Sequence, residues 1–367
     1  MFNDIFKNQT VLVTGHTGFQ GSWTILWLKQ LGANVVGYSL PAPTTPSMFC
    51  DLNLENEITH IVNDIRDFSD LQESINKYKP DFVFHLAAQP LVRTSYDKPL
   101  ETFQTNIMGT VNLLESIRNV SNVKAAIVMT SDKCYQIREG VDAYNENDSM
   151  GGYDPYSASK GATELVTQSY RNSFFMQSKN VNLPIPIATI RAGNVIGGGD
   201  WAKDRIVSDC MRSLYANEPI VLRNPDAVRP WQHVLEVISG MLWLAASLTK
   251  KSKLEGAWNF GPLISNKKIT VRDIASKIIS EWGSGNFICK KPNDDFYETK
   301  ILQLDSNKAI SQLGWKPVYT LDKAISETVS WYKNYKNNPT EIKNFTISQI
   351  LNYAEKAKLL NIPWAKV

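Results

Sequence analysis

Short apolar runs of strand length alternate with longer segments of helical periodicity through the first half of the chain. Strands are predicted where a short run is almost wholly apolar, at residues 10–15, 33–40, 80–88, 123–131 and 185–197. Helices are predicted where apolar residues recur every three or four positions, at 21–32, 70–79, 99–119 and 156–175. This alternation predicts an α/β fold, a doubly wound parallel Rossmann sheet with helices on both faces.

After Gly197 the pattern becomes irregular and rich in Gly and Pro, and helices are next predicted at 274–283 and 320–335, with Thr320 as N-cap of the second. We therefore predict a Rossmann domain at 1–195, with return segments around 230–262, and a smaller C-terminal lobe at 196–367 that covers a bound substrate. The polar tail from about Pro339 predicts either a docking helix or an oligomer contact.

The composition limits the class of protein but does not indicate a function. The 367 residues are 43% hydrophobic and 20% charged with a net charge of +3, which is ordinary for a globular protein and too small to indicate a nucleic-acid surface. The four cysteines are scattered, so neither a disulfide framework nor a metal site is indicated, and a reducing cytoplasm is expected. No apolar stretch approaches the roughly 20 residues of a membrane span, and the N-terminus lacks the pattern of a secretory signal.

The segment between the first strand and the first helix reads GHTGFQG and places glycines at 15, 18 and 21. Glycines here allow a tight turn and a close approach of the backbone to a pyrophosphate, which the free N–H groups of a helix N-terminus attract. We therefore predict a dinucleotide site at Gly15, Gly18 and Gly21, against the alternative of a tight turn alone. The intervening residues His16, Thr17, Phe19 and Gln20 are assigned to the same site, although an incidental surface position for His16 stays open.

The adenosine end of the cofactor site is less clearly marked. An acidic residue commonly holds the ribose diol of NAD at the end of the second strand, but here the strand ends in Tyr38, Ser39 and Leu40. NAD is favoured and NADP stays open. Asp64 is predicted to meet the adenine edge or else to cap the following helix. The remaining residues assigned to the cofactor site are Ile65, Leu86, Ala87 and Ala88.

Two groups of residues are suited to proton transfer. Tyr156 and Lys160 lie four apart on one helical face, where an ammonium favours the phenolate of a tyrosine whose pKa is ordinarily about 10. Such a pair takes a hydroxyl proton while a nicotinamide takes the hydride. Ser131, Asp132 and Lys133 directly follow a buried strand and place a hydroxyl, an acid and an amine side by side, against the alternative of a solvated loop.

Together these motifs resemble the extended short-chain dehydrogenase/reductase family over nearly the whole chain, and within it the nucleotide-sugar 4,6-dehydratases. The resemblance rests on the glycine loop, FHLAAQ, TNIMGTVNLLE, TSDKCY, MGGYDPYSASK, RAGNVIGGGDWAKDRIVSD and RPWQHV. It implies NAD as cofactor, a Ser131–Tyr156–Lys160 catalytic set and a structural role for Asn106 beside the cofactor. The family's dehydratases carry Asp–Glu after the Ser/Thr, whereas this chain carries Asp132 and Lys133.

The resemblance further implies oxidation at C4 of a hexose, loss of water across C5 and C6, and return of the hydride to C6. Asp132 would be the acid, its pKa raised by burial, and Lys133 the C5 base or, alternatively, a charged stabiliser of the enolate. A CDP-linked glucose is implied by resemblance alone. A dTDP- or GDP-linked hexose, a 4-epimerase activity and a non-catalytic NAD-binding regulator stay as alternatives. The implied substrate contacts are Gln89, Arg93, Asn194, Arg205 and Arg229.

The same resemblance implies self-association. Members of the family commonly associate through paired helices, here the segments 99–115 and 156–170, so we expect a homodimer or homotetramer. No nucleic acid or membrane partner is expected.

Overall fold

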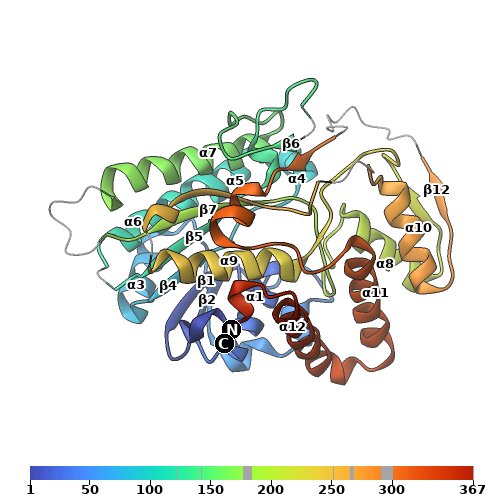
Figure 1. Cartoon of the computed structure of the whole chain (residues 1–367), viewed down its shortest axis with the longest axis horizontal. Helices are drawn as coiled ribbons and strands as arrows, with labels where there is room; N and C mark the ends of the chain where they lie inside the picture. The colour runs from blue at the N-terminus through green and yellow to red at the C-terminus, as the bar shows by residue number, and fades with distance from the viewer. Residues whose placement is uncertain are drawn as a thin grey trace.

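A parallel β-sheet forms the centre of the computed structural model, which describes residues 1–120, 122–141, 143–176, 184–250, 252–264, 268–290 and 301–366. Within these ranges the sheet has seven strands in the order β11-β7-β5-β4-β1-β2-β3 (Figure 1). The order runs outward from β1 in both directions, which confirms the predicted doubly wound fold. The strands are β1 (Thr10–Thr14), β2 (Asn34–Ser39), β3 (Thr59–Val62), β4 (Phe82–His85), β5 (Ala125–Met129), β7 (Ile187–Ala192) and β11 (Gly256–Phe260).

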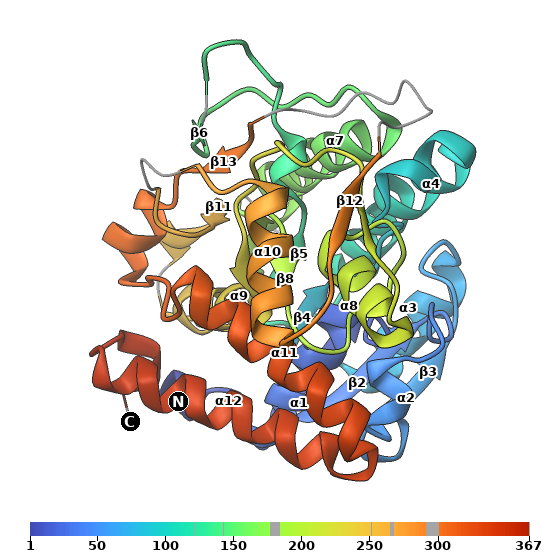
Figure 2. The same ribbon diagram turned by 90° about the vertical axis from the view of Figure 1, so that its right-hand side faces the viewer.

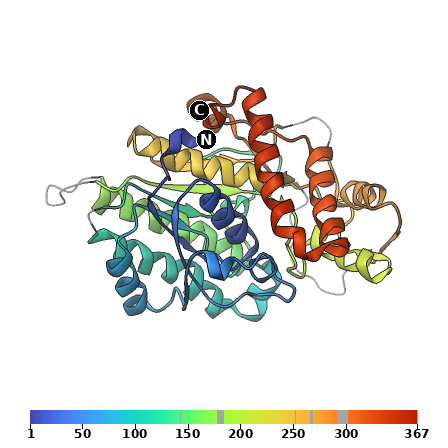
Figure 3. The same ribbon diagram turned by 90° about the horizontal axis from the view of Figure 1, so that it is seen from below.

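Helices cover both faces of the sheet, with the sheet as the middle layer (Figure 3). Alternate residues of β1 explain the arrangement, because Val11 and Val13 join the core under α1 (Phe19–Gln30) and α9 (Val234–Leu248), whereas Leu12 joins the opposite core. That opposite core is shared by α3 (Phe68–Tyr78) and α6 (Gly109–Arg118). Both faces of the central strands are therefore covered, which is why these strands are mostly apolar. Beside α6 lies α7 (Pro155–Tyr170), the helix predicted at 156–175.

Two predicted elements are divided in the structure. The helix expected at 99–119 consists of α5 (Pro99–Phe103), a π-helical turn (Gln104–Met108) and α6. The strand expected at 185–197 ends at Ala192 and resumes as β8 (Val195–Ile196), which pairs with β10 (Gln232–His233) outside the main sheet.

The second half of the chain builds a smaller group of elements beside that edge (Figure 2). It contains α8 (Ile206–Ala216), α10 (Val271–Trp282), α11 (Leu321–Asn337) and the two-stranded pair β9 (Ile220–Leu222) and β12 (Phe287–Cys289). Thr320 caps α11 by accepting a hydrogen bond from the Lys323 backbone N–H, as predicted. The domain division at residue 195 stays a prediction. The other elements are α2 (Met48–Asp51), α4 (Val92–Asp97), α12 (Ile342–Leu359), β6 (Ala143–Tyr144) and β13 (Gln303–Leu304).

The C-terminal tail returns to the first half of the chain. The helix α12 packs against α11 and α1, and the Trp364 ring stacks on Phe2 with centroids 5.0 Å apart, so the two termini lie together (Figure 1). The docking-helix prediction for the tail is therefore confirmed. Within the described ranges, none of the helices combines the length and the apolar character that a membrane span requires.

A buried carboxylate anchors this tail. Glu236, in the first turn of α9, accepts hydrogen bonds from the backbone N–H groups of Val318 and Tyr319 and, at 2.6 Å, from the Tyr353 hydroxyl of α12. Its side chain is only 1% exposed. Burial raises the pKa of Glu236 to about 7, although these donors oppose the shift. The folded protein therefore favours the protonated acid more than the unfolded chain does.

The first prediction is that Glu236→Gln weakens the pH dependence of stability. A raised folded pKa gives stability that is complete below pH 4.5, the ordinary value, and is lost as the pH rises through about 7. The loss corresponds to about 3 kcal/mol in the free energy of unfolding. Melting temperatures at pH 5 and pH 8 should therefore fall less in Glu236→Gln than in the wild type. The exposed Glu73→Gln variant should behave like the wild type, and a parallel shift of all three proteins would contradict the assignment.

Candidate active site

A cavity of about 700 Å³ lies along the carboxyl ends of the central strands and under the C-terminal group of elements. Its wall is built from the segments that follow β1, β2, β3, β4, β5 and β7, together with α7 and the loops around β9. His16, Gln89 and Asn106 are not among the lining residues. Of the predicted site residues, it is lined by Gly15, Thr17, Gly18, Phe19, Gln20, Gly21, Asp64, Ile65, Leu86, Ala87, Ala88, Arg93, Ser131, Asp132, Lys133, Tyr156, Lys160, Asn194, Arg205 and Arg229.

The glycine loop forms a close cradle before α1. Gly15 has a φ of +73°, and a Cβ placed there would lie 2.6 Å from the Ala87 backbone nitrogen. A Cβ at Gly21 would lie 2.2 Å from the Gly15 carbonyl oxygen. Gly18 is the N-cap of α1, so the free N–H groups of the helix begin at the cavity wall. The loop can follow this path only with glycine at positions 15 and 21, and it places backbone donors where an anionic pyrophosphate would bind.

His16 lies behind this cradle rather than in it. Its ring is fully buried, its Nε2 lies 2.7 Å from His60 Nδ1, and its edge packs on Phe49. Burial, followed by the nearby His60, lowers the pKa of His16 to about 3, so the ring is neutral at physiological pH. The surface-histidine alternative was therefore wrong. Any contact of His16 with cofactor phosphates would have to come from its backbone.

The adenosine end is lined by neutral groups from β2. Thr17 Oγ1 lies 2.9 Å from Ser39 Oγ and donates to the Leu40 carbonyl oxygen at 2.9 Å. Asp64 lines the cavity and pairs with Arg66 at 2.5 Å, and the hydrogen bond from Arg66 lowers the pKa of Asp64. The residue that caps α3 is Asp67, so the helix-capping alternative for Asp64 was wrong.

The predicted catalytic pair, Tyr156 and Lys160, lies on α7. Asp154 caps this helix by accepting a hydrogen bond from the Ser157 backbone N–H, which places Tyr156 and Lys160 on its first two turns. Burial raises the pKa of Tyr156 to about 12, although its hydrogen bond with Ser131 opposes this shift. Lys160 Nζ donates to the Met129 carbonyl oxygen at 3.2 Å, and burial lowers the pKa of Lys160 to about 8. The amine thus stays largely charged at neutral pH.

Ser131, Asp132 and Lys133 form one side of the cavity where β5 ends. Ser131 caps a 3₁₀ turn (Asp132–Cys134) by accepting a hydrogen bond from the Lys133 backbone N–H at 3.2 Å. Its hydroxyl also donates to Asp132 Oδ1 at 3.0 Å. The second oxygen of Asp132 is buried and has no hydrogen-bond partner among the described residues. Asp132 is 2% exposed, so the solvated-loop alternative was wrong for it.

The predicted substrate residues fall into two groups. Arg93, Asn194, Arg205 and Arg229 line the cavity, and Arg205 is also ion-paired with Asp200 at 2.9 Å. By contrast, Gln89 does not line the cavity, and its side-chain Nε2 donates to the Leu91 carbonyl oxygen at 3.0 Å and to Thr102 Oγ1 at 2.9 Å.

Asn106 lies in the π-helical turn and connects three segments of the chain through hydrogen bonds. Its Nδ2 donates to the Gln89 carbonyl oxygen at 3.1 Å and to Ser159 Oγ at 2.8 Å. These bonds join the segment after β4 to α7, the helix of Tyr156. This arrangement agrees with a structural role, and a direct cofactor contact for Asn106 stays a prediction without support from the cavity wall.

One charged residue of the cavity wall, Arg223, lay outside the motifs. It lines the cavity and pairs at 2.5 Å with Asp204, which was not assigned to the site. Arg223 comes from the irregular loop after β9, and no spacing in the sequence marks it. Glu164 was also missed, although it stands one helical turn after Lys160 and could have been found from that spacing.

The chain was compared with known protein families. A family model described as GDP-mannose 4,6 dehydratase matches residues 12–328. The chain belongs to this family. Among curated members, it is 48% identical over 331 residues to CDP-glucose 4,6-dehydratase of Salmonella typhimurium (strain LT2), covering 90% of this chain and 92% of that protein. It is 24% identical over 345 residues to a dTDP-glucose 4,6-dehydratase of Xanthomonas campestris, covering 88% and 93%. The predicted dehydratase branch is confirmed.

Solved structures of nucleotide-sugar epimerases share the fold of this chain. The UDP-glucuronic acid 4-epimerase of Bacillus cereus, in complex with UDP-glucuronic acid and NAD, superposes with a TM-score of 0.74 at 25% identity, covering 89% of this chain and 99% of that one. The UDP-glucose 4-epimerase of Thermotoga maritima, with UDP-glucose, gives a TM-score of 0.77 at 22% identity, covering 89% and 100%. The second likeness shows the fold alone.

Proposed function

We propose that this chain dehydrates CDP-D-glucose to CDP-4-dehydro-6-deoxy-D-glucose, using NAD as its hydride carrier. The observation that carries the proposal is the 48% identity to the Salmonella enzyme over 90% of the chain. The cavity supports it, because it holds two sets of proton-transfer groups, Ser131–Tyr156–Lys160 and Asp132–Lys133. An epimerase needs only the first set.

The residues present fit NAD. The glycine cradle and the start of α1 would hold the pyrophosphate, Ser39 and Asp64 lie where the adenosine would bind, and Lys160 lies at the nicotinamide end. The cavity's carboxyl-edge position is where doubly wound sheets bind nucleotides. When bound, NAD takes a hydride from C4 of the hexose and returns it to C6.

Tyr156 is the base of the oxidation step. Its phenolate accepts the proton of the C4 hydroxyl, and the contact with Ser131 lowers the pKa of Tyr156 against the larger effect of burial. With a pKa of about 12 in its buried site, Tyr156 needs a further positive charge nearby to ionise at neutral pH. Lys160 supplies one from the next turn of α7, because its ammonium persists below a pKa of about 8.

Asp132 and Lys133 carry out the elimination. The C4 ketone acidifies C5, the neutral amine of Lys133 takes the C5 proton, and the electron pair forms the C5–C6 double bond as the C6–O bond breaks. Asp132 gives its proton to the departing oxygen, which leaves as water, and Lys133 returns a proton to C5 when the hydride adds to C6. We assign that proton to Oδ2, the oxygen without a partner among the described residues. Lys133 as a charged stabiliser of the enolate stays the alternative.

The substrate's two phosphates require cationic partners. Arg229 is 5% exposed and lines the cavity, and Arg205 lies in the same wall, so both are proposed to contact the pyrophosphate. Asn194, in the loop between β7 and β8, and Arg93, on α4, are proposed contacts of the nucleotide sugar. A cytoplasmic location stays a prediction.

The direct test offers CDP-glucose, dTDP-glucose and GDP-mannose with NAD in separate reactions and measures each product's mass. Loss of one water from CDP-glucose alone is expected. Water loss from another nucleotide sugar would keep the dehydratase chemistry and remove the cytidine assignment. Unchanged masses in all three reactions would contradict a dehydratase and favour an epimerase, whose product has the mass of its substrate.

Replacing Lys133 by Met tests its part in the elimination. The variant should bind NAD with unchanged affinity, measured by calorimetry, but lose at least about a hundredfold in kcat, because a positioned base contributes this much. Lys203→Met, on an exposed loop residue near the cavity, is the matched control and should turn over like the wild type. Wild-type turnover by Lys133→Met would remove Lys133 from the mechanism.

We also propose that the chain forms a homodimer through α5, the π-helical turn and α7. Large apolar side chains are exposed there, namely Leu100 at 69%, Met108 at 49% and Leu165 at 57%. These residues lie on adjacent helices, because α5 and the π-helical turn both pack against α7. A patch of this kind on adjacent helices is suited to contact with its symmetry copy.

Leu165→Asp should therefore dissociate the oligomer. Burying an unpaired carboxylate in the symmetric contact is costly, since it occurs twice in each dimer. Sedimentation at micromolar concentration should give a dimer or a larger closed oligomer for the wild type and smaller species for Leu165→Asp. Leu359→Asp, on a residue 80% exposed in α12, should keep the wild-type size. A monomeric wild type would rule out this contact.

A further inference from the structure

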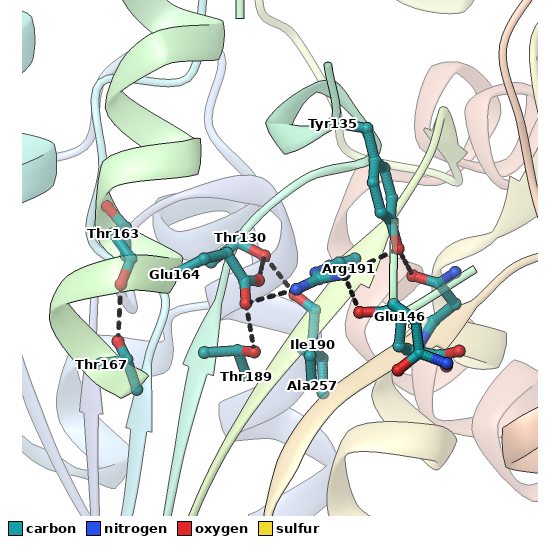
Figure 4. Close-up of polar contacts among 12 residues, drawn as sticks. Thr130, Tyr135, Glu146, Thr163, Glu164, Thr167, Thr189, Ile190, Arg191 and Ala257 are labelled. Atoms are coloured by element: carbon teal, nitrogen blue, oxygen red, sulfur yellow. Dashed lines mark hydrogen bonds and ion pairs between the residues drawn. The ribbon is translucent and has the colours of Figure 1, made fainter. Parts of the chain in front are cut away.

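A buried polar network includes Thr130 and Tyr135, which flank the catalytic turn, the 3₁₀ turn Asp132–Cys134 with its cap Ser131 (Figure 4). At its centre, Glu164 of α7 pairs with Arg191 of β7 at 2.9 Å, and the two side chains are only 5% and 4% exposed. Both Glu164 oxygens are satisfied, since Oε1 accepts from the Thr130 hydroxyl at 2.5 Å and Oε2 accepts from Thr189 at 2.7 Å and from Arg191. Burial alone would raise the pKa of Glu164, but Arg191 and the hydroxyls together lower it, so the pair is ionised.

The network reaches both ends of the turn that carries Ser131, Asp132 and Lys133. Thr130 precedes the turn, and its hydroxyl donates to Glu164 and to the Ile190 carbonyl oxygen at 3.0 Å. Tyr135 follows the turn, and its hydroxyl accepts from Arg191 Nη1 at 2.8 Å.

The Tyr135 hydroxyl in turn donates to Asn259 Oδ1 of β11 at 2.7 Å. The ring of Tyr135 is fully buried, so no water competes for these bonds. The residues before and after the catalytic turn therefore bond to Glu164 and Arg191, and these two charged residues pair with each other.

Glu164 also belongs to the helix of the predicted catalytic pair. It stands four residues after Lys160 and eight after Tyr156, so a shift of α7 would move all three together. The same carboxylate therefore contacts the elimination turn through Thr130 and shares a rigid helix with the base of the oxidation step.

We propose that Glu164, Arg191, Thr130 and Tyr135 form a clamp that positions Asp132 and Lys133 relative to Tyr156 and Lys160. None of the four clamp residues is assigned to the chemistry itself, so they are positioning residues. The proposal rests on the proposed function, because only a dehydratase needs both proton-transfer sets to act in turn on one hexose.

Stability alone does not account for the clamp. A buried ion pair gains little over well-packed apolar residues, because desolvation offsets the attraction between the charges. Arg191 Nε even lacks a hydrogen-bond partner among the described residues. What the ion pair supplies is geometry, since the guanidinium donates to Glu164 through Nη2 and to Tyr135 through Nη1, and both oxygens of the carboxylate are bonded, so that few arrangements satisfy all of these bonds. Displacing a catalytic group by about 1 Å can cost about a hundredfold in rate.

The test uses Tyr135→Phe and Thr130→Val, each of which removes one hydroxyl of the clamp without leaving a new charge unpaired. Tyr353→Phe is the matched control, because that buried hydroxyl also bonds a carboxylate but lies on α12, away from the turn. The first readout needs no substrate, namely hydrogen exchange of the Lys133 and Cys134 amides, which bond to Ser131 within the turn.

Both clamp variants should exchange these two amides roughly tenfold faster than the wild type and the control. With CDP-glucose, kcat should fall roughly tenfold with KM nearly unchanged, and the absorbance of reduced nicotinamide should build up during turnover, because elimination slows more than oxidation. Unchanged exchange in the clamp variants, or an equal effect in Tyr353→Phe, would overturn the clamp. A wild type inactive on CDP-glucose would instead overturn the proposed function, and the exchange result would still decide the clamp.

Discussion

All strands of the central sheet run parallel, so the segments that follow them emerge at one edge. The glycine loop after β1, the segment Leu86–Ala88 after β4 and Ser131 after β5 are far apart in the sequence but line one cavity for this reason. Both faces of the central strands are covered, which leaves this edge as the natural place for polar side chains to gather. The whole site depends on this parallel arrangement.

Burial then sets the charges of the side chains gathered at that edge. It raises the pKa of Tyr156 and lowers that of Lys160, so both groups are moved toward their neutral forms. Burial therefore moves the two pKa values apart, to about 12 for Tyr156 and about 8 for Lys160. The contact of Tyr156 with Ser131 opposes part of the shift of the tyrosine. A positive charge beside Tyr156, proposed above to be the Lys160 ammonium, is therefore needed to complete the base.

Local patterns in the sequence predicted the elements and motifs that depend on neighbours along the chain. The glycine loop, the Thr320 cap and the helix of Tyr156 and Lys160 are all of this kind. The burial of His16 could not be predicted, because it depends on His60 of β3 and on Gly37, where a Cβ would lie 2.5 Å from the His16 ring. The π-helical turn at Asn106 was missed as well, since its bonds go to Gln89 and Ser159.

The Glu164–Arg191 pair, too, could not be predicted from the sequence, although it bears on the proposed function. Each residue has a local signal, since Glu164 continues the face of Lys160 and Arg191 stands in an otherwise apolar strand. Their partnership arises only when α7 packs across β7, and only then do Thr130 and Tyr135 become the two ends of one support. A dipeptide such as Asp132–Lys133 can supply an acid and a base. Which of the two side chains reaches C6 and which reaches C5 depends on how the turn is positioned. The buried charges bonded to its two flanking residues are what hold it.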